Sequence, residues 1–191
     1  IKLVPHVKKV RPVAVDPRVE LAKVQLPEQL FADSLVNTWG LRNEPCKTFS
    51  LSTDAYEGTA AIHLKWNKQG EQCNWMEFGM SWNNWEAVDF IPIIDKAALQ
   101  FYCKTPTTTD SIALKVGFGN YKYQYVGLDL SVNFLADGDT FTDEWQKVVI
   151  PLSAFNFHEN HMEANIIKHL QVKLKGDGEV FIDDIQLVTH Q

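Results

Sequence analysis

Residues 167–188 read IKHLQVKLKGDGEVFIDDIQLV, two alternating segments on either side of a glycine-rich turn. From Ile167 to Leu174, and again from Glu179 to Val188, apolar and polar residues largely alternate. A period of two is typical of a β-strand with one face in the core. Gly176-Asp177-Gly178 lies between the segments, and glycine adopts positive φ angles without steric cost. The stretch therefore predicts two strands joined as a hairpin.

Similar segments recur along the chain from Leu30 onward, while helix signals are scarce. Further strands are predicted over residues 59–66, 75–82, 98–104, 111–118, 121–130 and 145–151. Eight to ten strands without helical crossovers pair in antiparallel fashion, and a set of this size is best buried as two packed sheets. The predicted fold class is all-β, a two-sheet antiparallel β-sandwich of the jelly-roll type.

Composition limits the function classes. The chain has 191 residues, of which 45% are hydrophobic, enough for one domain with a well-formed core. Its net charge of −6 argues against nucleic acid as the main partner, because phosphate binding needs clustered Lys and Arg. No apolar run reaches the roughly 18 residues of a membrane span, so none is predicted.

Residues 1–26 differ from the remainder. They carry a net charge of +4, which leaves −10 for residues 27–191. Pro5, Pro12 and Pro17 interrupt hydrogen-bonded structure and favour an extended backbone. We predict that residues 1–26 are a linker or the edge of a preceding domain, and that residues 27–191 form the β-sandwich. A basic tail that binds a membrane or nucleic acid is the alternative.

The three cysteines, Cys46, Cys73 and Cys103, have neither the spacing of a zinc site nor the density of a disulfide scaffold. They are interpreted as buried apolar thiols, with one disulfide possible and the third cysteine left free.

A tyrosine triplet is the most informative candidate site. If Val126 and its alternate neighbours face the core, then Tyr121, Tyr123 and Tyr125 point outward, together with Asp129. By the same parity, Trp75 and Glu77 lie on the solvated face of their strand. Flat rings stack on the apolar C–H faces of pyranose sugars, while polar groups bind the hydroxyls. The alternative is that the rings cover a sheet edge or pack under a loop.

Other polar and aromatic residues complete this predicted platform. Glu77, Asp129, Lys115, Gln124 and Asn120 are candidates for hydrogen bonds to the sugar hydroxyls. Among the tryptophans, Trp66 and Trp82 fall in the core register, Trp39 and Trp145 are ambiguous, and Trp85 follows Asn83-Asn84 in a loop and is a candidate for the rim of the site.

Catalytic signals are poor. The segment His158-Glu-Asn-His161 lacks the i, i+4 histidines of a zinc protease and is interpreted as a solvated loop. No nucleophile elbow, P-loop or dinucleotide fingerprint is present. We therefore predict a binding module rather than an enzyme, with a jelly-roll lyase or hydrolase as an alternative.

Acidic residues form a second candidate constellation. Asp33, Asp54, Glu57, Asp183 and Asp184 could gather at an edge of the sandwich, where carboxylate and carbonyl oxygens can hold a calcium ion. The alternative is that they are surface carboxylates.

Several motifs, in order, resemble one family. They are Phe31-Ala-Asp33 through Trp39, Asp54-Ala-Tyr-Glu-Gly58, Trp85-Glu-Ala-Val-Asp89, Leu99-Gln-Phe-Tyr-Cys-Lys104, Trp145-Gln-Lys-Val-Val-Ile-Pro-Leu-Ser-Ala-Phe155 and Val180-Phe-Ile-Asp-Asp-Ile-Gln-Leu187. Together they cover residues 27–191 and resemble the jelly-roll carbohydrate-binding modules of the galactose-binding-like superfamily, especially family eleven and the related domains of complex I intermediate-associated proteins.

This resemblance implies non-catalytic binding of a β-linked glucan on a sheet face, targeting of an attached glycoside hydrolase domain, and a secreted, periplasmic or cell-surface location. It also implies structural calcium at Asp33, Asp54 and Asp183. Two positions depart from the family pattern. Ala32 replaces an acidic residue, and Gly117-Phe-Gly119 stands where a ligand-binding Asp often occurs.

The sequence thus predicts a polysaccharide-binding β-sandwich. Its carbohydrate-binding residues are predicted to be Trp75, Glu77, Trp85, Lys115, Tyr121, Tyr123, Tyr125 and Asp129. A structural or docking module that orients a neighbouring enzyme is the alternative from a different class.

Overall fold

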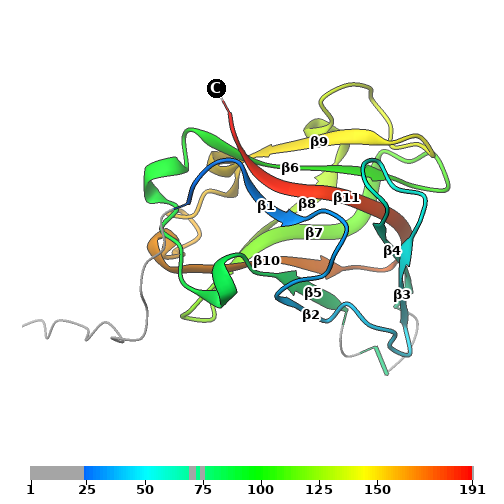
Figure 1. Ribbon diagram of the computed structural model, residues 1–191, viewed down its shortest axis with the longest axis horizontal. Coiled ribbons are helices and arrows are strands. Elements are labelled where there is room, and N and C mark those ends of the chain that lie inside the picture. The colour runs from blue at the N-terminus through cyan, green and yellow to red at the C-terminus, as the bar shows by residue number, and fades with distance from the viewer. Residues whose placement is uncertain (1–23, 69–71, 74–75, 191) are drawn as a thin grey trace, which may run out of the picture.

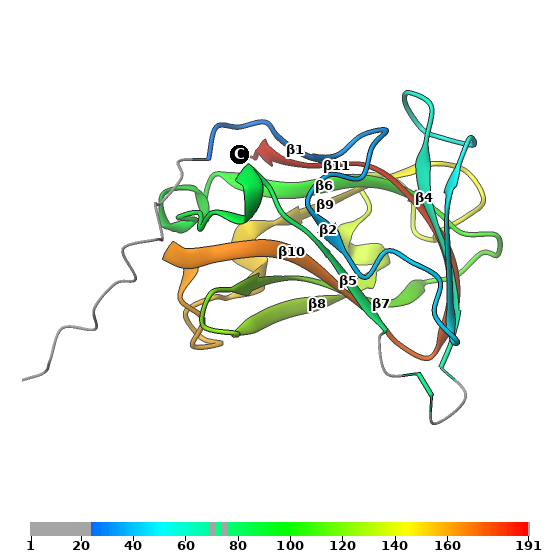
Figure 2. The ribbon, with the colours of Figure 1, turned by 60° about the horizontal axis from the view of Figure 1, so that its bottom comes forward.

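The computed structural model describes residues 24–190 except 69–71 and 74–75, and these residues form two stacked β-sheets (Figures 1 and 2). The strands are β1 (Glu28–Phe31), β2 (Thr38–Trp39), β3 (Lys47–Ser52), β4 (Ala61–Asn67), β5 (Glu77–Met80), β6 (Ala97–Lys104), β7 (Ser111–Asn120), β8 (Tyr125–Ser131), β9 (Gln146–Pro151), β10 (Ile167–Leu174) and β11 (Asp177–Thr189).

Helical residues in the described part of the chain are confined to short 3-10 turns. These are η1 (Asn83–Trp85), η2 (Ile91–Ile93), η3 (Val132–Phe134), η4 (Leu152–Phe155) and η5 (Ala164–Ile166). Accordingly, none of the helices found there has the length and apolar character that crossing a bilayer requires. The predicted linker, residues 1–26, lies almost wholly outside the described residues.

The two sheets are antiparallel throughout. The six-stranded sheet has the order β3-β4-β11-β6-β9, with β1 also paired to β11, and the five-stranded sheet has the order β2-β5-β10-β7-β8. Figure 2 shows them as two layers facing each other. The predicted two-sheet sandwich is confirmed.

The predicted hairpin over residues 167–188 is wrong in one respect. β10 and β11 have the predicted positions, but β10 pairs with β5 and β7, whereas β11 pairs with β1, β4 and β6. The turn at Gly176, whose φ is +50°, carries the chain from one sheet to the other. The alternation is the same in both arrangements, because apolar residues of either strand face one interior. Turn chemistry alone therefore does not distinguish a hairpin from a connection between sheets.

The core fills the space between the layers with the inward residues of both sheets. Phe118 of β7 packs against Phe155 and Phe90, with ring centroids 4.9 and 5.1 Å apart. Trp66 and Trp82 are buried, as their register predicts. Each fully buried aromatic or large aliphatic side chain stabilises the fold by roughly 1.5–3 kcal/mol, so the aromatic cluster is a main source of stability.

A disulfide and a buried lysine cross-link segments near β2 and β3. A disulfide joins Cys46, just before β3, to Cys73 in the segment after β4. The ammonium group of Lys47, which is buried, donates a hydrogen bond of 2.5 Å to the carbonyl of Gly40. Burial lowers the pKa of Lys47. Cys103 remains a free thiol in the core, where desolvation raises its pKa to about 12.

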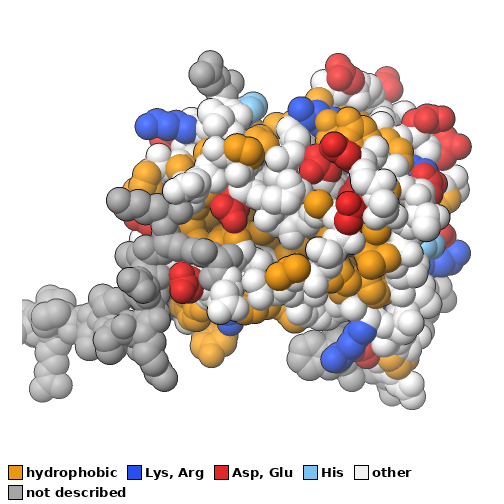
Figure 3. Space-filling model, in the orientation of Figure 1, with side chains coloured by type: hydrophobic (Ala, Val, Ile, Leu, Met, Phe, Trp, Pro, Cys, Tyr) orange, Lys and Arg blue, Asp and Glu red, His pale blue; other side chains and the backbone are white. Residues whose placement is uncertain are grey.

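Lys and Arg side chains are scattered over the face seen in Figure 3 and alternate there with acidic and apolar groups. That face carries no continuous basic patch of the kind that nucleic-acid binding requires.

Candidate functional site

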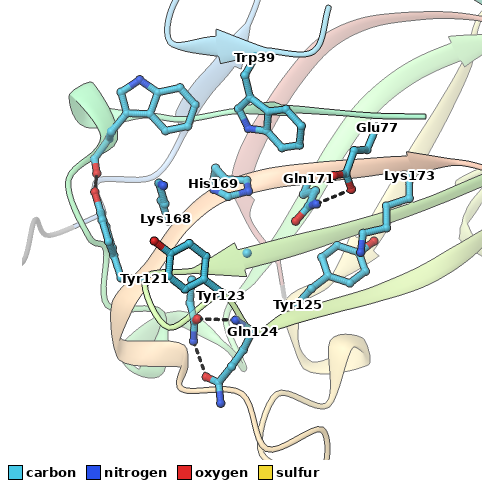
Figure 4. A pocket seen from close by; sticks show the side chains of 13 residues that line it. Trp39, Glu77, Tyr121, Tyr123, Gln124, Tyr125, Lys168, His169, Gln171 and Lys173 are labelled. Atoms are coloured by element: carbon cyan, nitrogen blue, oxygen red, sulfur yellow. Dashed lines mark hydrogen bonds between the residues drawn. The ribbon is translucent and has the colours of Figure 1, made fainter. Parts of the chain in front are cut away.

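A groove of about 830 Å³ lies on the outer face of the five-stranded sheet, and every strand of that sheet contributes to it (Figure 4). It is lined by Trp39, Glu77, Trp85, Gly119, Asn120, Tyr121, Tyr123, Gln124, Tyr125, Lys168, His169, Gln171 and Lys173. Its position follows from strand parity: Met76, Phe78 and Met80 are buried, so Glu77 and Gly79 face outward.

The floor of the groove follows one row of paired residues across the sheet. Trp39 pairs with Gly79, and Gly79 pairs with Gln171 on β10. Gln171 also pairs with Gly117, which in turn pairs with Gly127 on β8. Three of these five outward positions are glycine, so the sheet on either side of Gln171 contributes no side chains of its own to this row.

Two aromatic rings lie directly on this floor. A Cβ atom on Gly79 would be only 2.2 Å from Nε1 of Trp39, and one on Gly127 would be 2.2 Å from the hydroxyl oxygen of Tyr125. Ordinary van der Waals contacts are 3.4–4 Å. Only glycine allows the rings to approach the backbone this closely, and both side chains are half-buried as a result.

One end of the groove is closed by Trp85 and Tyr121. The hydroxyl of Tyr121 donates a hydrogen bond to the carbonyl of Trp85 and so links η1 to the β7–β8 loop. The ammonium nitrogen of Lys168 lies 5.8 Å from the ring centroid of Trp85 and 5.2 Å from that of Tyr121. These contacts join the three side chains into a wall, of which Figure 4 labels Tyr121 and Lys168.

The predicted strand over residues 121–130 is wrong at its start. β8 begins only at Tyr125, and Tyr121 and Tyr123 lie in the loop that precedes it. The side-chain carbonyl of Asn120 accepts hydrogen bonds from the backbone N–H groups of Lys122 and Gln124 at 2.9 and 3.0 Å, which starts the turn. Tyr123 has a φ of +60° and is 95% exposed. The tyrosines therefore do not form a ladder on one strand, although all three line the groove.

The predicted polar partners are only partly brought together. Glu77 lines the groove and accepts a hydrogen bond of 2.8 Å from the amide of Gln171. Lys115 and Asp129 pair across β7 and β8 outside the groove lining, and Asp129 forms an ion pair with Lys175. Trp75 lies outside the described residues.

Sequence reasoning missed the groove residues of β10 and β2. The alternation of β10 has outward positions at His169, Gln171 and Lys173, so the sequence carried a signal for these residues. Burial, reinforced by the charge of Lys168, lowers the pKa of His169 to about 4 and keeps the ring neutral at pH 7. Trp39 contacts the edge of His169, with centroids 5.8 Å apart.

The predicted calcium residues do not form a cluster. Asp33 accepts hydrogen bonds from the N–H groups of Thr59 and Ala60, which lower its pKa. Asp54 forms an ion pair with Lys104.

The third predicted ligand, Asp183, accepts hydrogen bonds from the N–H groups of Tyr56, Glu57 and Asp184. Within the described residues no three acidic, histidine or cysteine side chains gather as metal ligands. Calcium prefers six to eight oxygen donors, and carboxylates already bound to N–H groups and a lysine do not fit that requirement. Calcium binding stays a prediction without support from this donor set.

Comparison with known proteins yields one matching family and several solved structures with a similar fold. The model of a family described as carbohydrate binding domain 30 matches residues 28–189. No curated protein sequence matches the chain.

Among solved structures, a family 30 carbohydrate-binding module of a cellulosomal cellulase of Clostridium thermocellum is similar. It has 19% sequence identity and a TM-score of 0.65, and the match covers 87% of this chain and 99% of that one. A family 11 module of Clostridium thermocellum, solved with a β-1,3-1,4-mixed-linked tetrasaccharide, is also similar. It has 11% identity and a TM-score of 0.57, with coverage of 86% and 97%. The predicted resemblance to family-eleven modules therefore holds for the fold, while the matching family is domain 30.

Proposed function

The chain belongs to the carbohydrate binding domain 30 family, and from this membership we propose that it binds a β-linked glucan in the groove of the five-stranded sheet. Members of this family are non-catalytic binding modules, so the chain is a carbohydrate-binding module rather than an enzyme. The family leaves open the ligand and the residues that hold it.

One observation carries this proposal: two half-buried rings, Trp39 and Tyr125, lie over glycines on one sheet face, in an open groove with polar groups beside them. Pyranose rings of β-linked glucans present flat C–H faces and equatorial hydroxyls. Rings on the floor stack on those faces, and Glu77 and Gln171 hydrogen-bond the hydroxyls. The similar family 11 module solved with a mixed-linked β-glucan tetrasaccharide has the same fold.

The affinity should be modest. A shallow groove that stacks two or three sugar residues provides about 4–8 kcal/mol, which corresponds to dissociation constants from millimolar to micromolar. An attached catalytic domain gains substrate by proximity even at such affinities.

Calorimetric titration tests the proposal. Mixed-linkage β-glucan and cello-oligosaccharides should release heat with the wild-type chain, and Trp39→Ala should weaken binding at least about tenfold. The matched control is Tyr56→Ala. Tyr56 is also half-exposed and aromatic, but it lies beside Tyr102 of the six-stranded sheet.

Three outcomes would count against the proposal. They are an absence of heat with every β-linked glucan, an equal loss of affinity in both variants, and a Trp39→Ala variant that binds as well as wild type. Melting temperatures of both variants establish that each remains folded.

The wider role follows from the same proposal. A module of this kind would keep an attached glycoside hydrolase on its polysaccharide, in a secreted, periplasmic or cell-surface protein. A docking role without sugar binding is the second candidate, and the failure of all glycans in the titration would favour it.

A further inference from the structure

The charge of the groove differs from that of the domain around it. Residues 27–191 carry a net charge of −10, yet the groove is lined by two lysines, Lys168 and Lys173, and by a single carboxylate, Glu77. An acidic protein that directs excess positive charge into its binding groove favours an anionic ligand there.

Carboxylates lie near these lysines, Glu77 opposite Lys173 and Glu86 near Tyr121, but none of those described forms an ion pair with them. Lys173 pairs across the strands with Glu77 on one side and with Lys115 on the other, and Lys115 pairs with Asp129. Lys173 and Lys115 are like charges directly opposite each other, which destabilises a sheet. The acids beside them, Glu77 and Asp129, contact Gln171 and Lys175 instead.

Both groove lysines lie over aromatic rings instead. The ammonium nitrogen of Lys173 is 3.8 Å from the ring centroid of Tyr125, and that of Lys168 lies between Trp85 and Tyr121. Within the portion of the chain that the structure covers, neither lysine forms an ion pair, whereas Lys65, Lys104, Lys122 and Lys175 each do. A cation–π contact at a partly exposed site contributes only about 0.5–1 kcal/mol, so a carboxylate can compete for the ammonium groups.

The geometry of a sugar acid matches this arrangement. In a β-linked chair pyranose the substituent on C5 is equatorial and lies near the ring plane. When the sugar stacks on the floor of the groove, a carboxylate at that position points sideways toward the side chains around the ring. Lys168 and Lys173 are among those side chains (Figure 4).

We propose that the groove prefers β-linked chains that carry uronic acid residues over neutral chains of the same linkage, and that Lys168 and Lys173 set this preference. The inference rests on the proposed function, because it concerns the same groove.

A matched pair of ligands tests the preference: cellohexaose and the hexamer of β-1,4-linked glucuronic acid. The two have the same backbone and differ only in the oxidation state of the carbon attached to C5. Titrations are run at about 20 mM and about 500 mM sodium chloride, between which screening of charges changes several-fold. The uronic acid hexamer should bind the wild-type chain about tenfold more tightly at low salt, and high salt should reduce that ratio.

Variants then assign the preference to residues. The double variant Lys168→Met/Lys173→Met keeps the aliphatic stems and should lose the preference while still binding cellohexaose. The matched control is Lys65→Met, because Lys65 is exposed and lies on the six-stranded sheet. It should leave the ratio unchanged.

Each outcome has a distinct meaning. Equal or tighter binding of cellohexaose by the wild-type chain would overturn the uronic acid preference and leave the proposed function standing. Failure of both hexamers to bind would overturn the proposed function itself. A preference that persists in the double variant would show that other groups than these lysines cause it.

Discussion

The two outer faces of the sandwich both carry aromatic side chains, but the rings have different neighbours. On the six-stranded sheet, Tyr56 stacks on Tyr102 with centroids 3.5 Å apart, and His63 stacks on Phe181 at 4.1 Å. On the five-stranded sheet, Trp39 lies on a glycine. Rings of the first face stack on each other, whereas Trp39 and Tyr125 of the second face rest on glycine backbone.

Polar groups show the same contrast. On the six-stranded sheet, Glu179 binds both His63 and Lys65 at 2.9 Å, and these contacts lower the pKa of Glu179. In the groove, both ring nitrogens of His169 and the hydroxyl of Tyr125 are buried without a hydrogen-bond partner among the described residues. Unpaired buried polar atoms cost roughly 1–3 kcal/mol each. In the part of the chain that the structure describes, the opposite face has one such atom, Nε1 of Trp145, whereas the groove has three and gives up more stability.

The largest effect is expected when side chains are placed under the groove rings. In Gly79→Ala/Gly127→Ala, each new Cβ overlaps a ring atom and forces Trp39 and Tyr125 away from the floor. Affinity for β-glucan should fall by about thirtyfold, or about 2 kcal/mol, as measured by calorimetry.

The fold should survive this change, because the overlapping atoms belong to side chains at the surface. The melting temperature should therefore change little. Unaltered affinity in this folded variant would show that the two rings do not contact the ligand.

The opposite face should respond to substitution with lower stability and unchanged binding. Lys104 lies 5.0 Å from the ring centroid of Trp145 and 5.3 Å from that of Phe181, and it forms an ion pair with Asp54. Its side chain is only 14% exposed. Lys104→Ala should lower the free energy of unfolding by about 1–2 kcal/mol in urea titrations, with affinity for β-glucan unaltered. A weaker affinity in this variant would mean that the two faces are not independent.

Strand parity was largely readable from the sequence, since it depends only on local alternation. β10 has the predicted bounds, and the outward positions of Glu77 and Tyr125 follow from their buried neighbours. β1, β2 and β3 are short or poorly alternating, and no alternating segment predicted them. The loop before β8 was missed because a hydrogen-bonded turn at Asn120 interrupts an otherwise strand-like pattern.

The groove itself depends on pairs that are distant in sequence. Trp39 and Gly79 are 40 positions apart, and only the pairing of β2 with β5 brings them together. The sequence shows a tryptophan and a glycine, but not that one lies on the other. For the same reason Gly117 and Gly119 were read as the loss of a ligand-binding Asp, although Gly117 contributes to the groove floor.

Lowering the pH should reduce the stability of the fold through His169, the histidine of the groove. The pKa of His169 is lowered by burial to about 4, from 6.5 in the unfolded chain. The unfolded chain therefore takes up a proton as the pH falls below 6.5, which the folded chain resists until about pH 4, so stability falls over this window. In His169→Phe this loss is absent.

Between pH 7 and 4.5, the melting temperature of His169→Phe should fall by roughly 5–10 °C less than that of wild type. Carboxylates whose pKa is lowered in the fold, such as Asp33 and Asp54, affect both proteins equally. Parallel curves for the two proteins would show that His169 titrates normally in the fold.

The smallest effect on affinity is expected at Tyr123. This residue lines the groove but is not part of its floor, so its substitution tests whether the floor alone holds the ligand. This side chain is 95% exposed at the tip of the β7–β8 loop and lies on no glycine of the sheet, in contrast to Trp39 and Tyr125. An exposed ring without packing neighbours loses conformational entropy when it stacks on a sugar, which offsets part of the contact energy. Tyr123→Ala should therefore weaken binding only about threefold and leave the melting temperature unchanged. A loss as large as that of Trp39→Ala would show that the ligand extends over the loop, and the binding surface would then include the rim as well as the floor.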